Sequence, residues 1–311
     1  MKAIVLKEAG NVENLEYVEL QKPTISSGQV LVKVKAISIN PVDVKSRAGK
    51  GVYGRIKTEN PLILGWDIAG IVEETQSSDF KVGDEVFGMI NFPGHGKAYA
   101  EYVAAPANQL ALKPENITFE DAAASTLVAL TAYQALVHNA DVQQGQTVLV
   151  HAASGGVGHI AVQIAKHLGA KVTGTSSAKN KDFVLGLGAD SHIDYHGFDW
   201  GSAGRTFDFV LDTIGGGNID HSLEVTKEGG SIISIPTGLN EEVTSKAESK
   251  GVKGYFILVQ SNGEDMKQIA SLLKSGAIKP HVSKTFPFEQ MREAHLEQET
   301  GRTVGKIVIT L

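Results

Sequence analysis

The chain has 311 residues, which at roughly 100–200 residues per domain predicts two domains with a sizeable core. Its 29 Lys and Arg against 35 Asp and Glu give a formal charge of −6, and no long basic run occurs, so we expect no nucleic-acid or anionic-membrane partner. Hydrophobic residues make up 42% of the chain and recur along its whole length, which excludes a disordered protein.

Cysteine is absent from the sequence, which excludes disulfides, thiolate metal sites and cysteine nucleophiles. The first residues hold only a short apolar stretch before Lys7 and Glu8, so we expect no signal peptide. No window reaches the roughly 18 uninterrupted apolar residues of a membrane span. We therefore expect a cytoplasmic protein with no membrane partner.

The first 115 residues are predicted to be β-rich. Gln29–Ile37 alternates apolar and polar residues, the pattern of a half-buried strand. Further short strands are predicted at residues 68–73 and 85–90, each bounded by turn residues such as glycine and proline. Glycines and strands at this spacing indicate a small, irregular barrel.

The pattern changes after Pro114. Thr118 followed by Asp121 predicts a helix start that resembles a capping box, and a helical stretch follows to about Asn139. Short strands separated by helices then predict a parallel sheet with right-handed crossovers, an α/β architecture. These strands are residues 147–151, 170–175, 192–194, 208–212, 231–235 and 252–259. Beyond them we expect helices at 265–274 and through His295, and a last strand, Gly305–Leu311, that returns to the first domain.

The segment His151–Gly158 carries the strongest chemical signal, because it leaves an apolar strand and opens a helix. A dinucleotide needs glycines that let the backbone approach its pyrophosphate and a helix N-terminus with free N–H donors. Of the usual G-x-G-x-x-G pattern, Gly155 and Gly158 are present and Ala153 stands in the first position. A plain glycine-rich turn is the alternative, but the strand before and the helix after favour dinucleotide binding.

The end of the next predicted strand selects the dinucleotide. An NAD enzyme places an acidic residue there for the ribose 2′-hydroxyl. Residues 173–180 contain no acid, and instead offer hydroxyl groups and Lys179, which suit a 2′-phosphate. A solvated turn with an incidental lysine is the alternative, and NADPH is the predicted cofactor.

Five ordered segments resemble a known family: Asn40–Asp43, Gly65–Gly70, Val82–Gly88, Ala152–Gly158 and Gly305–Val308. Together they are similar to the zinc-independent quinone oxidoreductase and enone reductase branch of the medium-chain dehydrogenase/reductase superfamily, over essentially the whole chain. The resemblance implies a GroES-like, β-rich catalytic domain of residues 1–120 completed by residues 263–311. It implies a Rossmann domain with a doubly wound parallel sheet in residues 121–262, an active site in the cleft, and a homodimer.

The departures from the zinc-dependent branch of that superfamily concern its metal ligands. Asn40 or Pro41 stands where that branch has its first cysteine ligand, and Gly65-Trp66-Asp67 replaces its Gly-His-Glu. His192 and His196 are four residues apart but fall across a strand end rather than on one helix face. We therefore expect no metal site.

Without a metal to polarise a carbonyl, a substrate that is already electrophilic is favoured, namely a quinone or an α,β-unsaturated carbonyl compound. The protein need only donate hydrogen bonds to the oxygen on which charge collects and exclude water. The resemblance offers two candidate catalytic residues, Asn40 near the nicotinamide and Tyr53 in the pocket. For Asn40 the alternative is a loop-fixing role, and for Tyr53 it is substrate stacking or a plain surface loop. Asp43 is interpreted as structural.

The resemblance also assigns residues to each part of the cofactor. Ser154, Gly155, Gly156 and Val157, with Gly158 of the fingerprint, meet the pyrophosphate, and Ser177, Lys179 and Tyr195 surround the 2′-phosphate. Thr131 approaches the nicotinamide end, and Thr213 and Ile214 flank the adenosine.

Two other functions stay open. One is an enoyl-thioester reductase of the same superfamily, which would need a basic groove that this acidic chain does not obviously offer. The other is a non-catalytic NADPH-binding sensor or structural protein, which would bind the cofactor without turnover.

Overall fold

The first and last segments of the chain share one β-sheet in the computed structural model, which describes residues 1–236 and 238–311. Residues 1–130 and 259–311 form one compact unit (unit 1), and residues 131–258 form the other (unit 2). The sequence places the domain boundaries after residues 120 and 262, and these stay a prediction.

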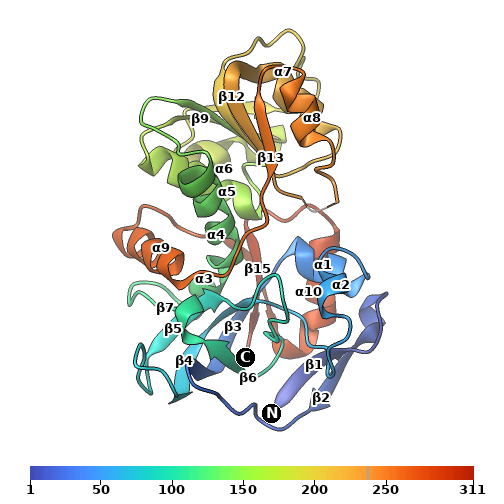
Figure 1. Ribbon diagram of the computed structural model, residues 1–311, viewed down its shortest axis with the longest axis vertical. Helices are drawn as coiled ribbons and strands as arrows, with labels where there is room; N and C mark the ends of the chain where they lie inside the picture. Colours follow the sequence, from blue (N-terminus) through green and yellow to red (C-terminus); the bar gives the residue numbers. More distant parts are fainter. Residues whose placement is uncertain (237) are drawn as a thin grey trace. The chain divides into compact units, whose positions relative to one another are not determined.

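Unit 1 is built on a seven-stranded sheet with the order β14-β15-β3-β4-β5-β7, in which β6 also pairs with β3 (Figure 1). A hairpin of β1 and β2 forms a second, two-stranded sheet. The strands are β1 (Lys2–Leu6), β2 (Leu15–Glu19), β3 (Gln29–Ile39), β4 (Asp67–Thr75), β5 (Glu85–Met89), β6 (Tyr102–Pro106), β7 (Ala111–Leu112), β14 (Val282–Pro287) and β15 (Lys306–Thr310). The predicted return of the C-terminal strand is confirmed, because β15 pairs antiparallel with β3.

Short helices accompany this sheet. They are α1 (Pro41–Arg47), α2 (Tyr53–Ile56), α3 (Phe119–Ala124), α9 (Gly263–Ser275) and α10 (Met291–Glu299), with 3₁₀ turns at Val12–Asn14, Ala107–Gln109 and Phe288–Gln290. Helix α4 (Leu127–Tyr133) continues along the chain into unit 2. The predicted cap of α3 is confirmed, because the Thr118 hydroxyl accepts a hydrogen bond from the Asp121 amide at 3.1 Å. The single helix expected up to Asn139 is instead divided into α3, α4 and a π-helical segment, Gln134–Asn139.

Unit 2 contains a six-stranded parallel sheet with the order β10-β9-β8-β11-β12-β13. The strands are β8 (Thr147–Val150), β9 (Lys171–Ser176), β10 (Ser191–Asp194), β11 (Phe207–Asp212), β12 (Thr226–Ser234) and β13 (Lys253–Phe256). The connecting helices are α5 (Gly156–His167), α6 (Lys181–Gly186), α7 (Asn218–Val225) and α8 (Val243–Glu248), with a 3₁₀ turn at Ala178–Asn180. Numbered from the first strand, this order is 3-2-1-4-5-6, that of a doubly wound dinucleotide-binding fold.

The helices of unit 2 cover both faces of its sheet. Helices α5 and α6 lie on one side and α7 and α8 on the other (Figure 1). Leu149, Val210 and Ile232 of three neighbouring strands pack with Leu223 of α7 and Ala247 of α8 in one buried cluster. The predicted parallel sheet is therefore confirmed, and with unit 1 it gives the α/β fold class expected.

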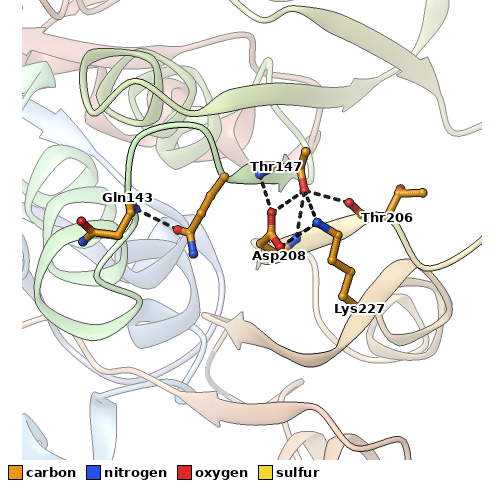
Figure 2. A network of polar contacts seen from close by, with 6 residues as sticks. Gln143, Thr147, Thr206, Asp208 and Lys227 are labelled. Atoms are coloured by element: carbon orange, nitrogen blue, oxygen red, sulfur yellow. Dashed lines mark hydrogen bonds and ion pairs between the residues drawn. The ribbon is translucent and has the colours of Figure 1, made fainter.

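A polar network joins the amino ends of two central strands of this sheet (Figure 2). The Asp208 carboxylate accepts hydrogen bonds from the Thr147 amide at 2.8 Å and from the Lys227 ammonium group at 2.7 Å. The Thr147 hydroxyl donates to the Thr206 carbonyl at 2.7 Å. Because both carboxylate oxygens of Asp208 are engaged, this network holds β8 and β11 in register. It occupies the amino edge of the sheet, and the carboxyl edge is left for binding.

Among the residues that the structure describes, no helix combines the length and the apolar character needed to cross a lipid bilayer.

Candidate functional site

The carboxyl edge of the unit 2 sheet gathers most of the predicted cofactor residues. In a parallel sheet all strands end at the same edge, and ligands bind where the strand order reverses. Here the reversal falls between β8 and β11. The loop after β8 contains Ser154–Gly158, the turn after β9 contains Ser177 and Lys179, Tyr195 follows β10, and Thr213 and Ile214 follow β11. The structure therefore brings these four segments to one edge.

The loop after β8 leads directly into α5. Gly155 is the N-cap of this 12-residue helix, whose first turn contains Gly156, Val157 and Gly158. A Cβ atom at Gly158 would overlap the Ala152 carbonyl oxygen, so only glycine lets the helix start this close to the loop. Ala152 itself has a φ of +46°, a left-handed conformation that is unfavourable for a residue with a Cβ.

The alanine in the first fingerprint position has a structural explanation. Ala153 is completely buried, and the residue facing it on β9 is Gly174. A Cβ at Gly174 would lie 2.7 Å from the Ala153 Cβ and 2.5 Å from a Val184 methyl group. Gly174 on the neighbouring strand therefore leaves room for the Ala153 side chain.

Two buried side chains, Thr175 and His151, support the glycine loop after β8. The Thr175 hydroxyl accepts a hydrogen bond from the Ala152 amide at 3.2 Å and lies 3.2 Å from His151 Nδ1. His151 is 1% exposed, and burial lowers its pKa to about 4, so its ring is neutral at physiological pH. Because the Thr175 hydroxyl oxygen accepts from the Ala152 amide, the hydroxyl hydrogen is available for His151 Nδ1. These two contacts hold Ala152 in its left-handed conformation.

The segments after β9 and β10 contain the predicted 2′-phosphate residues. Ser177 is half-buried and Lys179 is exposed in a 3₁₀ turn; residues 173–180 contain no acid, although Asp194 of β10 pairs with Ser176 at the end of β9. Tyr195 is 49% exposed, and its ring stacks on His196 with centroids 4.1 Å apart. The Asn180 side-chain amide, through Nδ2, donates a hydrogen bond to the Ser154 hydroxyl at 3.1 Å, which ties this turn to the glycine loop.

The loop after β11 is held by one carboxylate. Asp212, completely buried, accepts hydrogen bonds from the Ile214 and Gly215 amides at 3.0 and 3.1 Å. The Thr213 hydroxyl donates to the His151 carbonyl oxygen at 2.8 Å, joining this loop to the start of the glycine loop. Thr131, the predicted nicotinamide contact, is 1% exposed. It lies in α4, which precedes the first strand of the unit 2 sheet in the chain.

These features fit a dinucleotide with a 2′-phosphate. The α5 N-terminus offers backbone N–H donors and the positive end of a helix dipole to the pyrophosphate. Lys179 offers a solvent-exposed ammonium group where an NAD enzyme has a carboxylate that would repel the phosphate.

In unit 1, Asn40 lies in a fully buried polar network. Its side-chain amide donates to Asp67 Oδ2 at 2.7 Å and to the Ser38 carbonyl at 3.4 Å, and its Oδ1 accepts from the Lys306 ammonium group. Its backbone amide donates to Asp43 Oδ2 at 2.6 Å. Both ends of the side chain are therefore engaged, which favours the loop-fixing alternative, and the catalytic role of Asn40 stays a prediction.

The charged members of this network have shifted pKa values. Burial, helped by the charge of Asp67, raises the pKa of Asp43 to about 7. Burial lowers the pKa of Lys306 to about 8 although Asp67 and Asp43 oppose that shift. Beside them, the Tyr99 hydroxyl lies 2.9 Å from His295 Nε2, and burial lowers the pKa of His295 to about 3.

Tyr53 lies outside that network. It is the first residue of α2, is partly exposed, and lines a hollow of about 360 Å³ together with apolar residues of β1 and β2 and the segment 57–62. The structure thus places the two candidate catalytic residues in different surroundings, one buried and one at a cavity wall. The role of Tyr53 also stays a prediction.

Sequence reasoning missed several residues that organise these loops: Thr175, Asn180, Asp212 and Lys306. Asn180 adjoins Lys179, and Asp212 and Thr175 end predicted strands. Their positions in the sequence therefore indicated that they lie near the predicted cofactor site. Lys306 belongs to the family-like segment Gly305–Val308, but its burial was not predicted, because a lysine that opens a terminal strand is usually solvated.

The two histidines considered for a metal have separate partners. His192 Nε2 lies 2.7 Å from the Ser176 hydroxyl, and His196 Nδ1 lies 2.9 Å from Asp194. Within residues 1–236 and 238–311, no three His, Cys, Asp or Glu side chains are grouped so that they could hold a metal ion.

Two family models match the chain. One describes the alcohol dehydrogenase GroES-like domain and matches residues 26–115, and the other describes a zinc-binding dehydrogenase and matches residues 187–309.

Individual proteins match over nearly the whole chain. A 2-methylene-furan-3-one reductase from Solanum lycopersicum is 35% identical over 99% of this chain and 79% of its own length. The solved quinone oxidoreductase of Coxiella burnetii is 36% identical with a TM-score of 0.94, over 100% of this chain and 99% of that one. The Escherichia coli quinone oxidoreductase, solved in complex with NADPH, is 29% identical with a TM-score of 0.89, over all of both chains.

Proposed function

We propose, on the premise that this chain belongs to the quinone oxidoreductase and enone reductase branch of the medium-chain dehydrogenase/reductase superfamily, that it is an NADPH-dependent reductase of quinones or α,β-unsaturated carbonyl compounds. One observation of this chain carries the cofactor part. A glycine loop opens α5 at the carboxyl edge of the sheet, and the neighbouring β9 turn has Lys179 and no acid. The relatives' names supply the substrate class: an enone reductase and two quinone oxidoreductases.

NADPH, when bound, supplies a hydride from its nicotinamide ring. The protein's own residues then have three tasks. The first turn of α5 and Ser154 bind the pyrophosphate, and Lys179, Ser177 and Tyr195 bind the 2′-phosphate. Tyr53 donates a hydrogen bond to the substrate oxygen on which negative charge collects; one such donor is typically worth about 10²–10³ in rate.

The reaction proceeds without a metal in this proposal. The chain has no cysteine, and Trp66 stands where the zinc-dependent branch has a histidine, so this chain lacks their ligand set. We also propose a homodimer joined through the cofactor units, which gel filtration with light scattering tests. A cytoplasmic location stays a prediction for cell fractionation.

The test follows NADPH absorbance after mixing the chelator-treated protein with 1,4-benzoquinone, a naphthoquinone and a short-chain enone, with NADH in parallel. We expect NADPH loss with at least one acceptor and slower loss with NADH. Tight NADPH binding without loss in any mixture would favour the sensor alternative. Activity only with an enoyl thioester would favour the carrier-linked reductase.

A further inference from the structure

A lysine from the last strand is completely enclosed beneath the Asn40 loop. Lys306 is 2% exposed, and its ammonium group donates to the Ile39 carbonyl at 2.7 Å and to Asn40 Oδ1. A buried ammonium group is costly unless it has acceptors and a compensating charge. Asp67 and Asp43, both 0% exposed, supply that charge.

This arrangement fixes the orientation of the Asn40 amide. Lysine only donates hydrogen bonds, so it must face the carbonyl end of the amide. The Asp67 carboxylate only accepts them, so it must face the NH₂ end, which lies 2.7 Å from its Oδ2. Lys306, Asn40 and Asp67 therefore form a directed chain in which each partner determines the next.

The other oxygen of Asp67 reaches the start of a helix. Asp67 Oδ1 accepts a hydrogen bond from the Leu127 amide at 3.1 Å. The first N–H groups of a helix have no partner within the helix, and a carboxylate there also complements the helix dipole. Asp67 thus caps α4 from strand β4, although it lies 60 residues earlier in the chain.

Helix α4 also contains Thr131, one turn after Leu127 and on the same face. Thr131 is the residue assigned to the nicotinamide end of the cofactor. Helix α4 continues directly into the π-helical segment Gln134–Asn139, so its N-terminal turn is the end at which backbone N–H groups need acceptors from outside the helix. The Asp67 carboxylate supplies such an acceptor at Leu127, one turn before Thr131.

We propose that Lys306 and Asp67 are positioning residues: Lys306 orients the Asn40 amide, Asn40 holds the Asp67 carboxylate, and Asp67 fixes the first turn of α4 and with it Thr131. The inference rests on the proposed function for the role of Thr131, but the tie to α4 can be measured without turnover. Lys306 faces Asn40, Asp67 and Asp43, and Asp43 in turn faces Tyr99 and the charge of Asp67.

The experiment compares Lys306→Met, Asp67→Asn and the double variant with wild type. Lys306→Met alone leaves two buried carboxylates without a cation and is expected to destabilise unit 1 strongly. The double variant removes one charge of each sign and regains much of that loss. Lys113→Met is the matched control, because Lys113 is another enclosed lysine of unit 1, with a side chain 5% exposed that pairs with Glu85.

The first readout is hydrogen exchange of the segment 126–133 in the protein without cofactor. We expect exchange at least about tenfold faster in the double variant than in Lys113→Met, at equal distance from each protein's unfolding midpoint. Equal exchange rates in the double variant and in Lys113→Met would overturn the proposed link between Asp67 and α4, whether or not the protein turns over substrate.

The second readout separates binding from turnover. The 2′-phosphate and pyrophosphate contacts lie on unit 2, so the double variant is expected to bind NADPH within about twofold of wild type while kcat falls at least about tenfold. Wild-type kcat is expected to fall as the pH rises through the pKa of Lys306, about 8, and this fall is expected to be absent in the double variant. An unchanged kcat and pH profile would overturn the positioning role. If wild type consumes no NADPH, the proposed function fails and hydrogen exchange still decides the inference.

Discussion

Lys179 tests the choice of cofactor at a single side chain. It is exposed just after β9, where we propose that it binds the 2′-phosphate that distinguishes NADPH from NADH. Lys179→Ala is expected to weaken NADPH binding about ten- to hundredfold and NADH binding less than about twofold, as measured by fluorescence titration. Lys171→Ala is the control, because Lys171 is exposed at the opposite end of the same strand. Equal losses for both cofactors would show that Lys179 does not read the 2′-phosphate.

A variant of Tyr53 tests the proposed hydrogen-bond donor to the substrate oxygen. Its ring lines a hollow of about 360 Å³, and the phenylalanine variant keeps that surface while removing only the hydroxyl. We expect Tyr53→Phe to lower kcat with a short-chain enone about 10²-fold, with NADPH binding unchanged. A variant that turns over at the wild-type rate would leave Tyr53 a stacking surface.

Buried polar residues mark the limit of sequence reading at this scale. Gly155, Gly158 and Lys179 were predictable because their neighbours form a strand, a turn and a helix in order. Asn40 and the structural role of its neighbour Asp43 were recognised, but its bond to Lys306 was not, because Lys306 lies 266 residues away in the chain and no local pattern joins the two. Burial decides whether polar side chains such as those of Asn40 and Lys306 can contact a ligand. It depends on the assembled sheet and is not visible in the local sequence.

Among the elements, the start of α5 requires glycine at position 158. Gly158→Ala would drive a Cβ into the Ala152 carbonyl oxygen, and overpacking of this kind typically costs about 1–3 kcal/mol. We expect at least about tenfold weaker binding of both NADPH and NADH, because the pyrophosphate is common to them.

The matched control for that variant is Gly186→Ala in α6. A Cβ there meets nothing within 4 Å, and its φ is not positive, so alanine is expected to be neutral or slightly stabilising. Unchanged affinity in Gly158→Ala would mean that α5 can start further from the loop without losing the cofactor.

The elements also show why some predictions were incomplete. The strands of unit 2 were predictable because they are short apolar runs between helices. The helix expected up to Asn139 is interrupted at Ser125 and Thr126, whose hydroxyls bond the carbonyls of Asp121 and Ala123. Strand β14 was not predicted, since its residues are mostly exposed and it pairs only with β15 at the edge of the sheet.

For the whole molecule, a buried histidine contributes to the loss of stability in acid. His295 of unit 1 has a pKa lowered by burial to about 3, against an ordinary value of 6.5. Below pH 6.5 the unfolded chain takes up a proton that the folded chain refuses, so stability falls as the pH drops through this window. Between pH 6.5 and 4 the loss is on the order of 3 kcal/mol for this one group.

His295→Phe removes the titrating ring and keeps an aromatic side chain against Tyr99, with which His295 makes an edge contact at 5.7 Å. Denaturant unfolding at pH 6.5 and 4 is expected to show a smaller loss of stability in this variant than in wild type. Asp43, whose raised pKa acts in the opposite direction, is present in both proteins and cancels in the comparison. Equal losses would mean that His295 is protonated in the folded protein.

Transfer of a labelled hydride tests the central claim most directly. The protein, treated with a chelator, is given a short-chain enone and NADPH with both hydrogens at C4 of the nicotinamide replaced by deuterium, and the product is examined by mass spectrometry and NMR. Our account predicts one deuterium at the β carbon, with the α carbon protonated from solvent. A product without deuterium, or reduction only after zinc is added, would contradict metal-free hydride transfer by this protein.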